Sequence, residues 1–267
     1  MKLGVIGCGK MATALVKGAI SRGVVNVDDV IGVARSEASR EKFSEETGGR
    51  NSAEIGEVIR ESDVLLLATK PYDLPRIFES GGFRKFPDKL LVSVAAGVTL
   101  ETMEGLTGRK CRVVRTMPNT PSLVGKGATA YCLGSRCEER DREVVKALLD
   151  AVGISVEVPE KLMNAVTGVS GSGPAYIFMV IEAMADGGVL AGLPRADAIR
   201  LAAQTVSGAA EMVLQTGLHP AALKDMVASP GGTTIAGITA LEDGNIRSAF
   251  ISAVRAAATR AEELGKA

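Results

Sequence analysis

The chain is short of aromatic side chains, histidine and net charge. Aromatic residues make up 3% of its 267 residues, tryptophan is absent, His219 is the single histidine, and 31 basic residues balance 31 acidic ones. Because the chain has neither a basic run nor a net positive charge, it lacks the electrostatic surface that a polynucleotide binder needs. We therefore expect no nucleic acid among its partners.

Cysteine is sparse as well. The four cysteines, at positions 8, 111, 132 and 137, form no CxxC pair. Together with the single histidine, this spacing argues against a structural metal centre and against a disulfide framework. We expect no bound metal.

An uninterrupted apolar span is also lacking. The apolar stretch over residues 174–193 contains Glu182 and Asp186, and a strand pattern already begins at Lys2. These features predict neither a membrane span nor a signal peptide, so we expect a cytoplasmic protein.

What the sequence does contain is a dinucleotide fingerprint. An apolar strand pattern over residues 2–6 is followed by GCGKMA at residues 7–12 and by a helical pattern to about residue 22. In such a GxGxxA motif Gly7 permits the tight turn, Gly9 lets a pyrophosphate approach the backbone, and Ala12 keeps the helix close to the strand. A purely structural turn is the alternative. The predicted cofactor contacts here are Gly7, Gly9, Lys10, Met11 and Ala12.

The end of the second predicted strand, residues 29–34, bears on which dinucleotide is bound. An NAD enzyme places an acid there for the ribose hydroxyls. This chain has Arg35 and Ser36 instead, and an arginine with a hydroxyl can hold a 2′-phosphate. We predict NADPH, with NADH as the weaker alternative because Glu37 follows directly.

The pattern of predicted secondary structure changes near residue 160. Before it, near-continuous apolar runs at residues 64–68, 90–94 and 112–115 are typical of parallel strands covered on both faces, and 131–133 and 154–158 suggest edge strands. We predict an α/β fold, with a doubly wound, Rossmann-type parallel sheet over residues 1–160. Residues 161–267 are predicted to form an all-helical domain, with helices at about 174–191, 195–215, 220–228, 231–243 and 245–264.

Three segments follow predicted strands and should meet at one sheet edge, where ligands bind open parallel sheets. Small residues at 95–97 allow backbone contact with ribose or nicotinamide, Lys70 can bond the ribose, and Asn119 can bond the carboxamide. Each segment taken alone fits an ordinary loop equally well. The predicted contacts are Thr69, Lys70, Pro71, Ala95, Ala96, Gly97, Met117 and Asn119.

A second anion cradle is predicted at residues 229–234, SPGGTT. Ser229 is interpreted as an N-cap and Pro230 as the first helical residue, which leaves the N–H groups of Gly231, Gly232 and Thr233 without partners inside the helix. Such donors suit a carboxylate or a phosphate. The alternative is a capped surface helix that tolerates two glycines.

The helical half is rich in alanine and poor in large side chains. A unit of about 100 residues built this way buries little apolar surface alone, so we predict a core shared between subunits of a homo-oligomer. A self-contained bundle is the alternative.

Over its whole length the chain resembles the pyrroline-5-carboxylate reductase family. The resemblance rests on the fingerprint, on RTMPNTP at 115–121, on VSGSGPAY at 169–176 and on LKDMVASPGGTT at 223–234. It implies reduction of 1-pyrroline-5-carboxylate to L-proline by NADPH, the last step of proline biosynthesis. It also implies a helical dimerisation domain, homodimers gathered into larger rings, and sites shared between subunits.

The resemblance assigns residues as well. The substrate would lie against Val227, Ser229, Gly231, Gly232, Thr233 and Thr234, and the Thr234 hydroxyl would face the ring nitrogen. Asn51 is the nearest counterpart of an asparagine that binds the adenosine end in this family, although it lies farther upstream than usual.

Two other functions stay open at this point. β-Hydroxyacid dehydrogenases share the two-domain plan, and Gly168, Gly171 and Gly173 fit their glycine spacing, but Ile177 and Ile181 stand where they need lysine and asparagine. Without the lysine, alcohol oxidation has no base. In this chain residues 171–174 are then interpreted as a tight turn into a long buried helix. A cofactor-sensing module without turnover is the other possibility.

His219-Pro220 is interpreted as a helix start rather than a catalytic acid.

Overall fold

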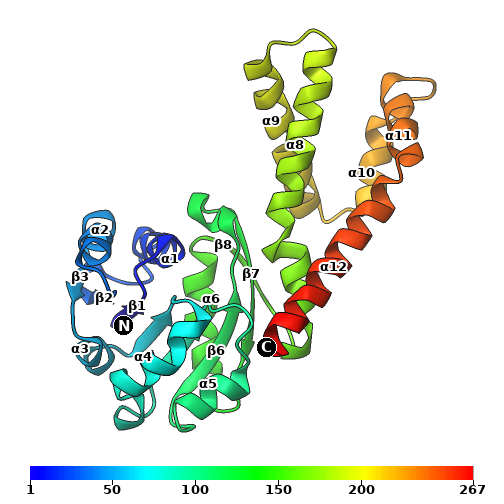
Figure 1. The fold of residues 1–267 in the computed structure, drawn as a ribbon. Coiled ribbons are helices and arrows are strands. Elements are labelled where there is room, and N and C mark those ends of the chain that lie inside the picture. Colours follow the sequence, from blue (N-terminus) through cyan, green and yellow to red (C-terminus); the bar gives the residue numbers. More distant parts are fainter. Residues whose placement is uncertain (267) are drawn as a thin grey trace. The chain divides into compact units, whose positions relative to one another are not determined.

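The computed structural model describes residues 1–266 and divides the chain into two compact units. The first comprises Met1–Gly171 together with the segment from Ala257 onward, and the second comprises Ser172–Ala256 (Figure 1). The last helix of the chain therefore contributes residues to both units.

The first unit is built on an eight-stranded sheet of order β3-β2-β1-β4-β5-β6-β7-β8. The first six strands of the chain are mutually parallel, β7 runs antiparallel to β6, and β8 is parallel to β7. The strand order reverses direction between β1 and β4, which is the switch point where such sheets bind ligands. The strands are β1 (Leu3–Ile6), β2 (Val30–Val33), β3 (Arg50–Ser52), β4 (Val64–Leu67), β5 (Leu90–Ser93), β6 (Arg112–Met117), β7 (Gly127–Leu133) and β8 (Gly153–Glu157).

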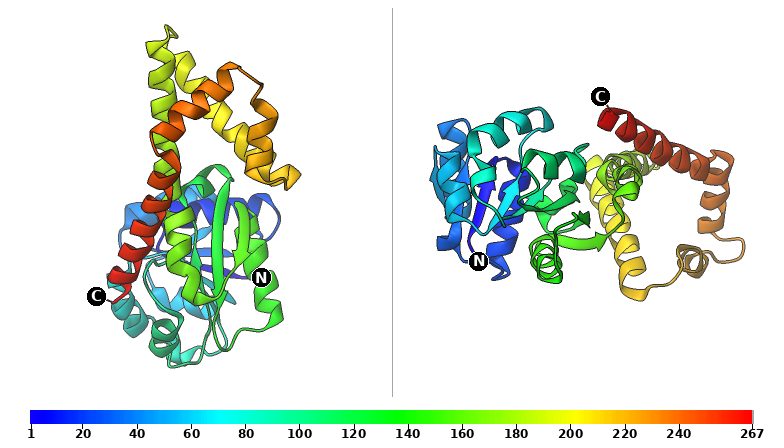
Figure 2. Two further views of the ribbon diagram at one scale, coloured as in Figure 1. Left: turned by 90° about the vertical axis from the view of Figure 1, so that its right-hand side faces the viewer. Right: turned by 90° about the horizontal axis from the view of Figure 1, so that it is seen from below.

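Helices cover both faces of this sheet (Figure 2). Successive strand residues enter opposite cores: Leu66 packs in the cluster under α1, α2 and α6, whereas Leu65 and Leu67 pack in the cluster under α3, α4 and α5. This explains why the strands are continuous apolar runs. The predicted doubly wound sheet is confirmed. Its helices are α1 (Lys10–Ser21), α2 (Glu37–Thr47), α3 (Ile55–Glu61), α4 (Leu74–Gly81), α5 (Leu100–Leu106), α6 (Glu139–Asp150) and α7 (Met163–Val166).

The second unit is helical throughout. A π-helical turn over Thr167–Gly171 precedes α8, and α8 packs on α9 through small residues: Ala185, Ala198 and Ala202 are buried there. A side chain at Gly188 would come within 3.2 Å of the Ala198 side chain, which is a tight contact, so glycine favours the close approach of the two helices. The helices are α8 (Gly173–Leu190), α9 (Arg195–Thr216), α10 (Pro220–Val227), α11 (Thr233–Asp243) and α12 (Ile246–Lys266).

The expectation that the chain turns into a long buried helix is wrong for the single chain. Although α8 packs on α9 and its Tyr176 hydroxyl donates to the Ala253 carbonyl of α12 at 3.4 Å, most α8 residues are exposed or half-buried. Phe178, Met179 and Leu190 of α8 are exposed. The stretch Glu160–Leu190 contains an 18-residue window with a mean hydropathy of 1.2, which by length and composition is enough for a membrane span. One such helix is weak evidence for a span, because a helix that packs against protein has the same composition.

Candidate functional site

A cleft of about 680 Å³ lies beyond the carboxyl ends of β1, β4, β5 and β6. The loops after these strands line it, together with the first turn of α1. The structure thereby brings most of the predicted cofactor contacts to one place. The predicted residues that line it are Gly7, Gly9, Lys10, Met11, Arg35, Thr69, Lys70, Pro71, Ala95, Ala96 and Met117.

The fingerprint glycines shape one side of this cleft. Gly7 has φ +100°, and a side chain there would lie 2.6 Å from the carbonyl oxygen of Ala68. Gly9 is the N-cap of α1, makes no side-chain cap bond, and has open space where a side chain would be. The first N–H groups of α1 therefore face the cleft uncovered, which suits a pyrophosphate. Ala12 is fully buried beneath them and packs the helix on the sheet.

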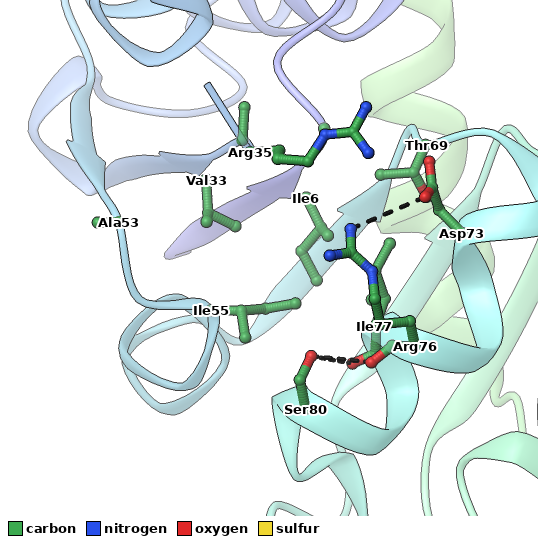
Figure 3. Close-up of a pocket in the computed structure, with 12 residues that line it drawn as sticks. Ile6, Val33, Arg35, Ala53, Ile55, Thr69, Asp73, Arg76, Ile77 and Ser80 are labelled. Carbon is green, nitrogen blue, oxygen red and sulfur yellow. Dashed lines mark hydrogen bonds and ion pairs between the residues drawn. The ribbon is translucent and has the colours of Figure 1, made fainter. Parts of the chain in front are cut away.

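A second cavity, of about 280 Å³, adjoins the cleft and shares Arg35, Thr69 and Asp73 with it (Figure 3). Isoleucine and valine side chains form its apolar wall, while the guanidinium groups of Arg35 and Arg76 border it. The Thr69 hydroxyl is buried without a hydrogen-bond partner at the junction of the two cavities. An apolar slot, two cations, an unsatisfied hydroxyl and an open helix start fit the adenosine and pyrophosphate parts of NADPH.

The loop after β2 differs in detail from its prediction. The Ser36 hydroxyl caps α2, accepting the Ser39 N–H at 3.3 Å and donating to the Ser39 hydroxyl at 2.7 Å, and Ser36 does not line either cavity. Ser39 lines the cleft in its place. Arg40 donates to the carbonyls of Ala34 at 2.9 Å and Arg35 at 3.5 Å, which fixes the backbone that presents Arg35.

Three other predicted cofactor residues lie outside the cleft. The Asn51 amide donates to the Ser44 hydroxyl at 2.7 Å, and Ala53 lines the cavity instead. Asn119 donates to the Ser170 carbonyl at 3.0 Å and accepts the Ala128 N–H at 2.9 Å, so its amide joins segments of the first unit and is not presented to a carboxamide. Gly97, with φ +78°, does not line the cleft either.

Cys8 lies within the fingerprint, but its thiol is not reactive. Cys8 lines the cleft, and its sulfur packs against the strand β2, 2.9 Å from where a side chain on Gly32 would begin. Burial raises the pKa of the Cys8 thiol to about 12, against a smaller opposing effect of Arg40. The thiolate is therefore scarce at neutral pH, and Cys8 serves packing rather than chemistry.

The second predicted cradle is built differently from its prediction. The helix α11 begins at Thr233 with Gly232 as N-cap, so Ser229 is not the N-cap and Pro230 is not helical. The Gly232 N–H donates to the Ser229 carbonyl at 3.1 Å, and Gly231 has φ +66°. Pro230 and Gly231 thus occupy the central positions of a type II turn, which takes up the N–H of Gly232.

The loop still presents free donors. The N–H groups of Thr233, Thr234 and Ile235 precede the first helical bond, which the Ala236 N–H makes to Gly232. A side chain at Gly232 would lie 2.3 Å from the Ser229 hydroxyl oxygen, so glycine keeps this helix start open. Thr233 is exposed and Thr234 is half-buried. Val227, also exposed, is the last residue of α10.

His219 is the N-cap of α10, as its interpretation as a helix start requires. Its Nδ1 atom accepts the Ala221 N–H at 3.2 Å. A ring nitrogen used in this way does not act as a proton donor.

Comparison with known proteins decides which family this arrangement represents. Residues 160–264 match the family model described as pyrroline-5-carboxylate reductase dimerisation, and residues 2–97 match the one described as NADP oxidoreductase, coenzyme F420-dependent. The pyrroline-5-carboxylate reductase of Methanosarcina acetivorans is 47% identical over 99% of this chain and 98% of its own length. This chain belongs to the pyrroline-5-carboxylate reductase family.

Other members of the pyrroline-5-carboxylate reductase family agree. The Arabidopsis thaliana enzyme is 45% identical over 99% of this chain and 96% of its own length. The solved structure of the Coxiella burnetii enzyme has a TM-score of 0.93 and 35% identity, covering 98% of both chains. That of Plasmodium falciparum, solved with NADP bound, has a TM-score of 0.87 and 31% identity over 99% of this chain and 98% of its own.

Sequence reasoning missed some residues that border the cleft, or the cavity that adjoins it, in this pyrroline-5-carboxylate reductase family member. Arg76 and Asp73 flank the start of α4, and Ser39 and Ile55 come from α2 and α3. None of them lies in a glycine motif or directly after a strand. The helical spacing of Asp73, Arg76 and Ser80 along one side of α4 is the signal that was available in the sequence.

Proposed function

We propose that this chain reduces the cyclic imine 1-pyrroline-5-carboxylate to L-proline with NADPH, as the last step of proline biosynthesis. The observation that carries the proposal is the open start of α11 after the Ser229–Gly232 turn, in a chain that also has a dinucleotide cleft. The chain is also 47% identical to a pyrroline-5-carboxylate reductase over 99% of its length, which supports the proposal further.

The substrate carries one carboxylate and one ring nitrogen. We assign the carboxylate to the loop of Val227, Ser229, Gly231, Gly232, Thr233 and Thr234. The free N–H groups there and the positive end of the α11 dipole favour an anion. The Thr234 hydroxyl, one position into the helix, faces the ring nitrogen and orients it.

NADPH supplies the hydride. The C=N bond becomes a C–N bond, and the nitrogen keeps the proton that made the imine electrophilic, so the balance needs no strong acid from the protein. The chain mainly positions the reacting atoms, and positioning alone lowers a barrier by several kcal/mol. The remaining predicted contacts hold the cofactor around the cleft and the cavity that adjoins it, with the exception of Ser36, Asn51, Gly97 and Asn119.

The assembly and location belong to the same proposal. The exposed apolar side chains of α8 and α9 suit a homodimer, and the resemblance extends this to larger rings in the cytoplasm. We place the boundary between the cofactor domain (1–160) and the helical dimerisation domain (161–267) near the start of the dimerisation match at residue 160.

The experiment follows NADPH oxidation with pyrroline-5-carboxylate, with a panel of β-keto acids, and with no second substrate. We expect turnover with the imine alone. Turnover with keto acids would favour a hydroxyacid dehydrogenase, and NADPH binding without turnover would favour a sensor.

Two variants then test the assigned roles. Thr234→Ala should lower kcat/KM by about tenfold, the loss expected for one hydrogen bond to a charged group, and Thr234→Ser should restore it. His219→Ala should leave kcat/KM near the parent value because His219 caps α10. The reverse pattern would make His219 the catalytic acid.

A further inference from the structure

Helix α4 places the guanidinium group of Arg76 at the cavity that adjoins the cleft. No sequence motif predicts a cation at this position. We propose that Arg76 and Arg35 together hold the 2′-phosphate of NADPH, and that Arg76 is a specificity-determining residue. The inference rests on the proposed use of NADPH. It extends the assignment made for Arg35 to a second element of the fold.

The position of Arg76 on α4 gives its side chain little part in the packing of the fold. The opposite side of α4 anchors the helix, with Leu74, Ile77 and Phe78 buried in the core. The Arg76 side chain is 64% exposed, lines the same cavity as Arg35, and forms an ion pair with Asp73 at 3.8 Å. Figure 3 shows both guanidinium groups at this cavity, Arg35 from the loop after β2 and Arg76 from α4.

The pair with Asp73 does not by itself explain Arg76. An exposed i,i+3 ion pair of this length adds little stability, since solvent screens it. The carboxylate does matter for a ligand, because Asp73 lines both cavities and would repel a phosphate. Arg76 neutralises it, so the cavity presents two guanidinium groups against one carboxylate.

Arginine is also the residue whose geometry suits the ligand. A guanidinium group donates two parallel hydrogen bonds to phosphate oxygens, and an exposed one can turn to do so. NADH has a ribose hydroxyl where NADPH has the phosphate. Removal of Arg76 should therefore weaken binding of the phosphorylated nucleotide selectively.

The test measures binding by calorimetry, without turnover, using adenosine 2′,5′-bisphosphate and 5′-AMP as probes. In Arg76→Gln the Kd for the bisphosphate should rise by about tenfold, the loss expected for a hydrogen bond between charged groups, while that for 5′-AMP rises far less. Arg60→Gln is the matched control, because Arg60 is an exposed arginine near the end of α3 and lines neither cavity. It should bind both probes as the parent does.

The double variant Asp73→Asn/Arg76→Gln separates two ways in which Arg76 could act. If Arg76 contacts the phosphate, the double variant still binds the bisphosphate several times more weakly than Asp73→Asn alone. Equal affinities of these two variants, or an equal loss for both probes in Arg76→Gln, would overturn the proposal. A parent protein that binds the bisphosphate selectively but reduces no pyrroline-5-carboxylate would refute the proposed function and leave this inference standing.

Discussion

Two glycines of the fingerprint, two positions apart, are needed for different physical reasons. Gly7 has φ +100° and no room for a side chain against the Ala68 carbonyl. Gly9 has φ −88°, which any residue adopts, and open space beside it. The fold therefore requires Gly7, whereas we propose that Gly9 is required by the bound pyrophosphate.

Substitution by alanine should separate these requirements. Gly9→Ala should keep its Tm within about 2 °C of the parent, because the methyl group meets nothing in the folded chain. It should weaken NADPH binding by roughly tenfold or more, because the methyl group fills space that the pyrophosphate needs. Thermal unfolding and NADPH fluorescence titration measure the two effects.

Gly7→Ala is the matched comparison. Its backbone strain of about 1–3 kcal/mol and its clash should lower the Tm by several degrees. A Gly9→Ala protein that binds NADPH as tightly as the parent would show that the pyrophosphate does not approach at Gly9.

At the scale of elements, the start of α11 is a place where the local sequence pattern does not determine the structure. Proline is common both at the first position of a helix and at the second position of a turn. In this chain the following Gly231 takes φ +66°, which completes the turn and moves the helix start to Thr233. The pattern Ser-Pro-Gly-Gly allowed both structures, and the prediction chose the wrong one.

Most strands and the helices of the second unit were predictable because their apolar patterns are local, whereas β3, with the sequence Arg-Asn-Ser, has no such pattern and was not predicted. Gly7, Lys70 and Ala95 reach one cleft because each follows a parallel strand, and that too follows from the sequence. The surroundings of Asn119 could not be predicted in this way, since its amide donates to Ser170, 51 residues away in the chain, and accepts from Ala128 on the neighbouring strand β7. Arg76 was missed for the same reason, because the packing of α4 on the sheet places it.

Helix α8 carries the element-scale prediction. Phe178 is 63% exposed in the single chain, and we propose that the partner subunit buries it. In a two-fold symmetric interface each substitution counts twice, so Phe178→Glu should raise the dimer dissociation constant by about a hundredfold or more. Sedimentation velocity at several concentrations measures this.

Phe178→Leu is the control for α8, because it keeps a large apolar side chain that an interface can bury. It should remain dimeric. A Phe178→Glu protein that dimerises like the parent would exclude Phe178 from the interface and move the search to the apolar residues of α9.

For the whole molecule, the two proposed recognition sites share one feature: a helix start with glycine as its N-cap and no side-chain cap. One opens α1 in the first unit and the other opens α11 in the second. An enzyme that divides its two reactants between separate units must bring the units together for hydride transfer. The family resemblance implies that two subunits do this, one supplying the cleft and the other the loop.

Complementation tests this sharing directly. Gly9→Asp places a carboxylate against the pyrophosphate, and Gly232→Val closes the start of α11 against Ser229, so each variant alone should be inactive. When the two are co-expressed and assort randomly into symmetric dimers, about a quarter of all sites combine an intact cleft with an intact loop. The mixture should recover about that share of the parent kcat. No recovery, with mixed dimers demonstrated by two affinity tags, would mean that each site is built from a single chain.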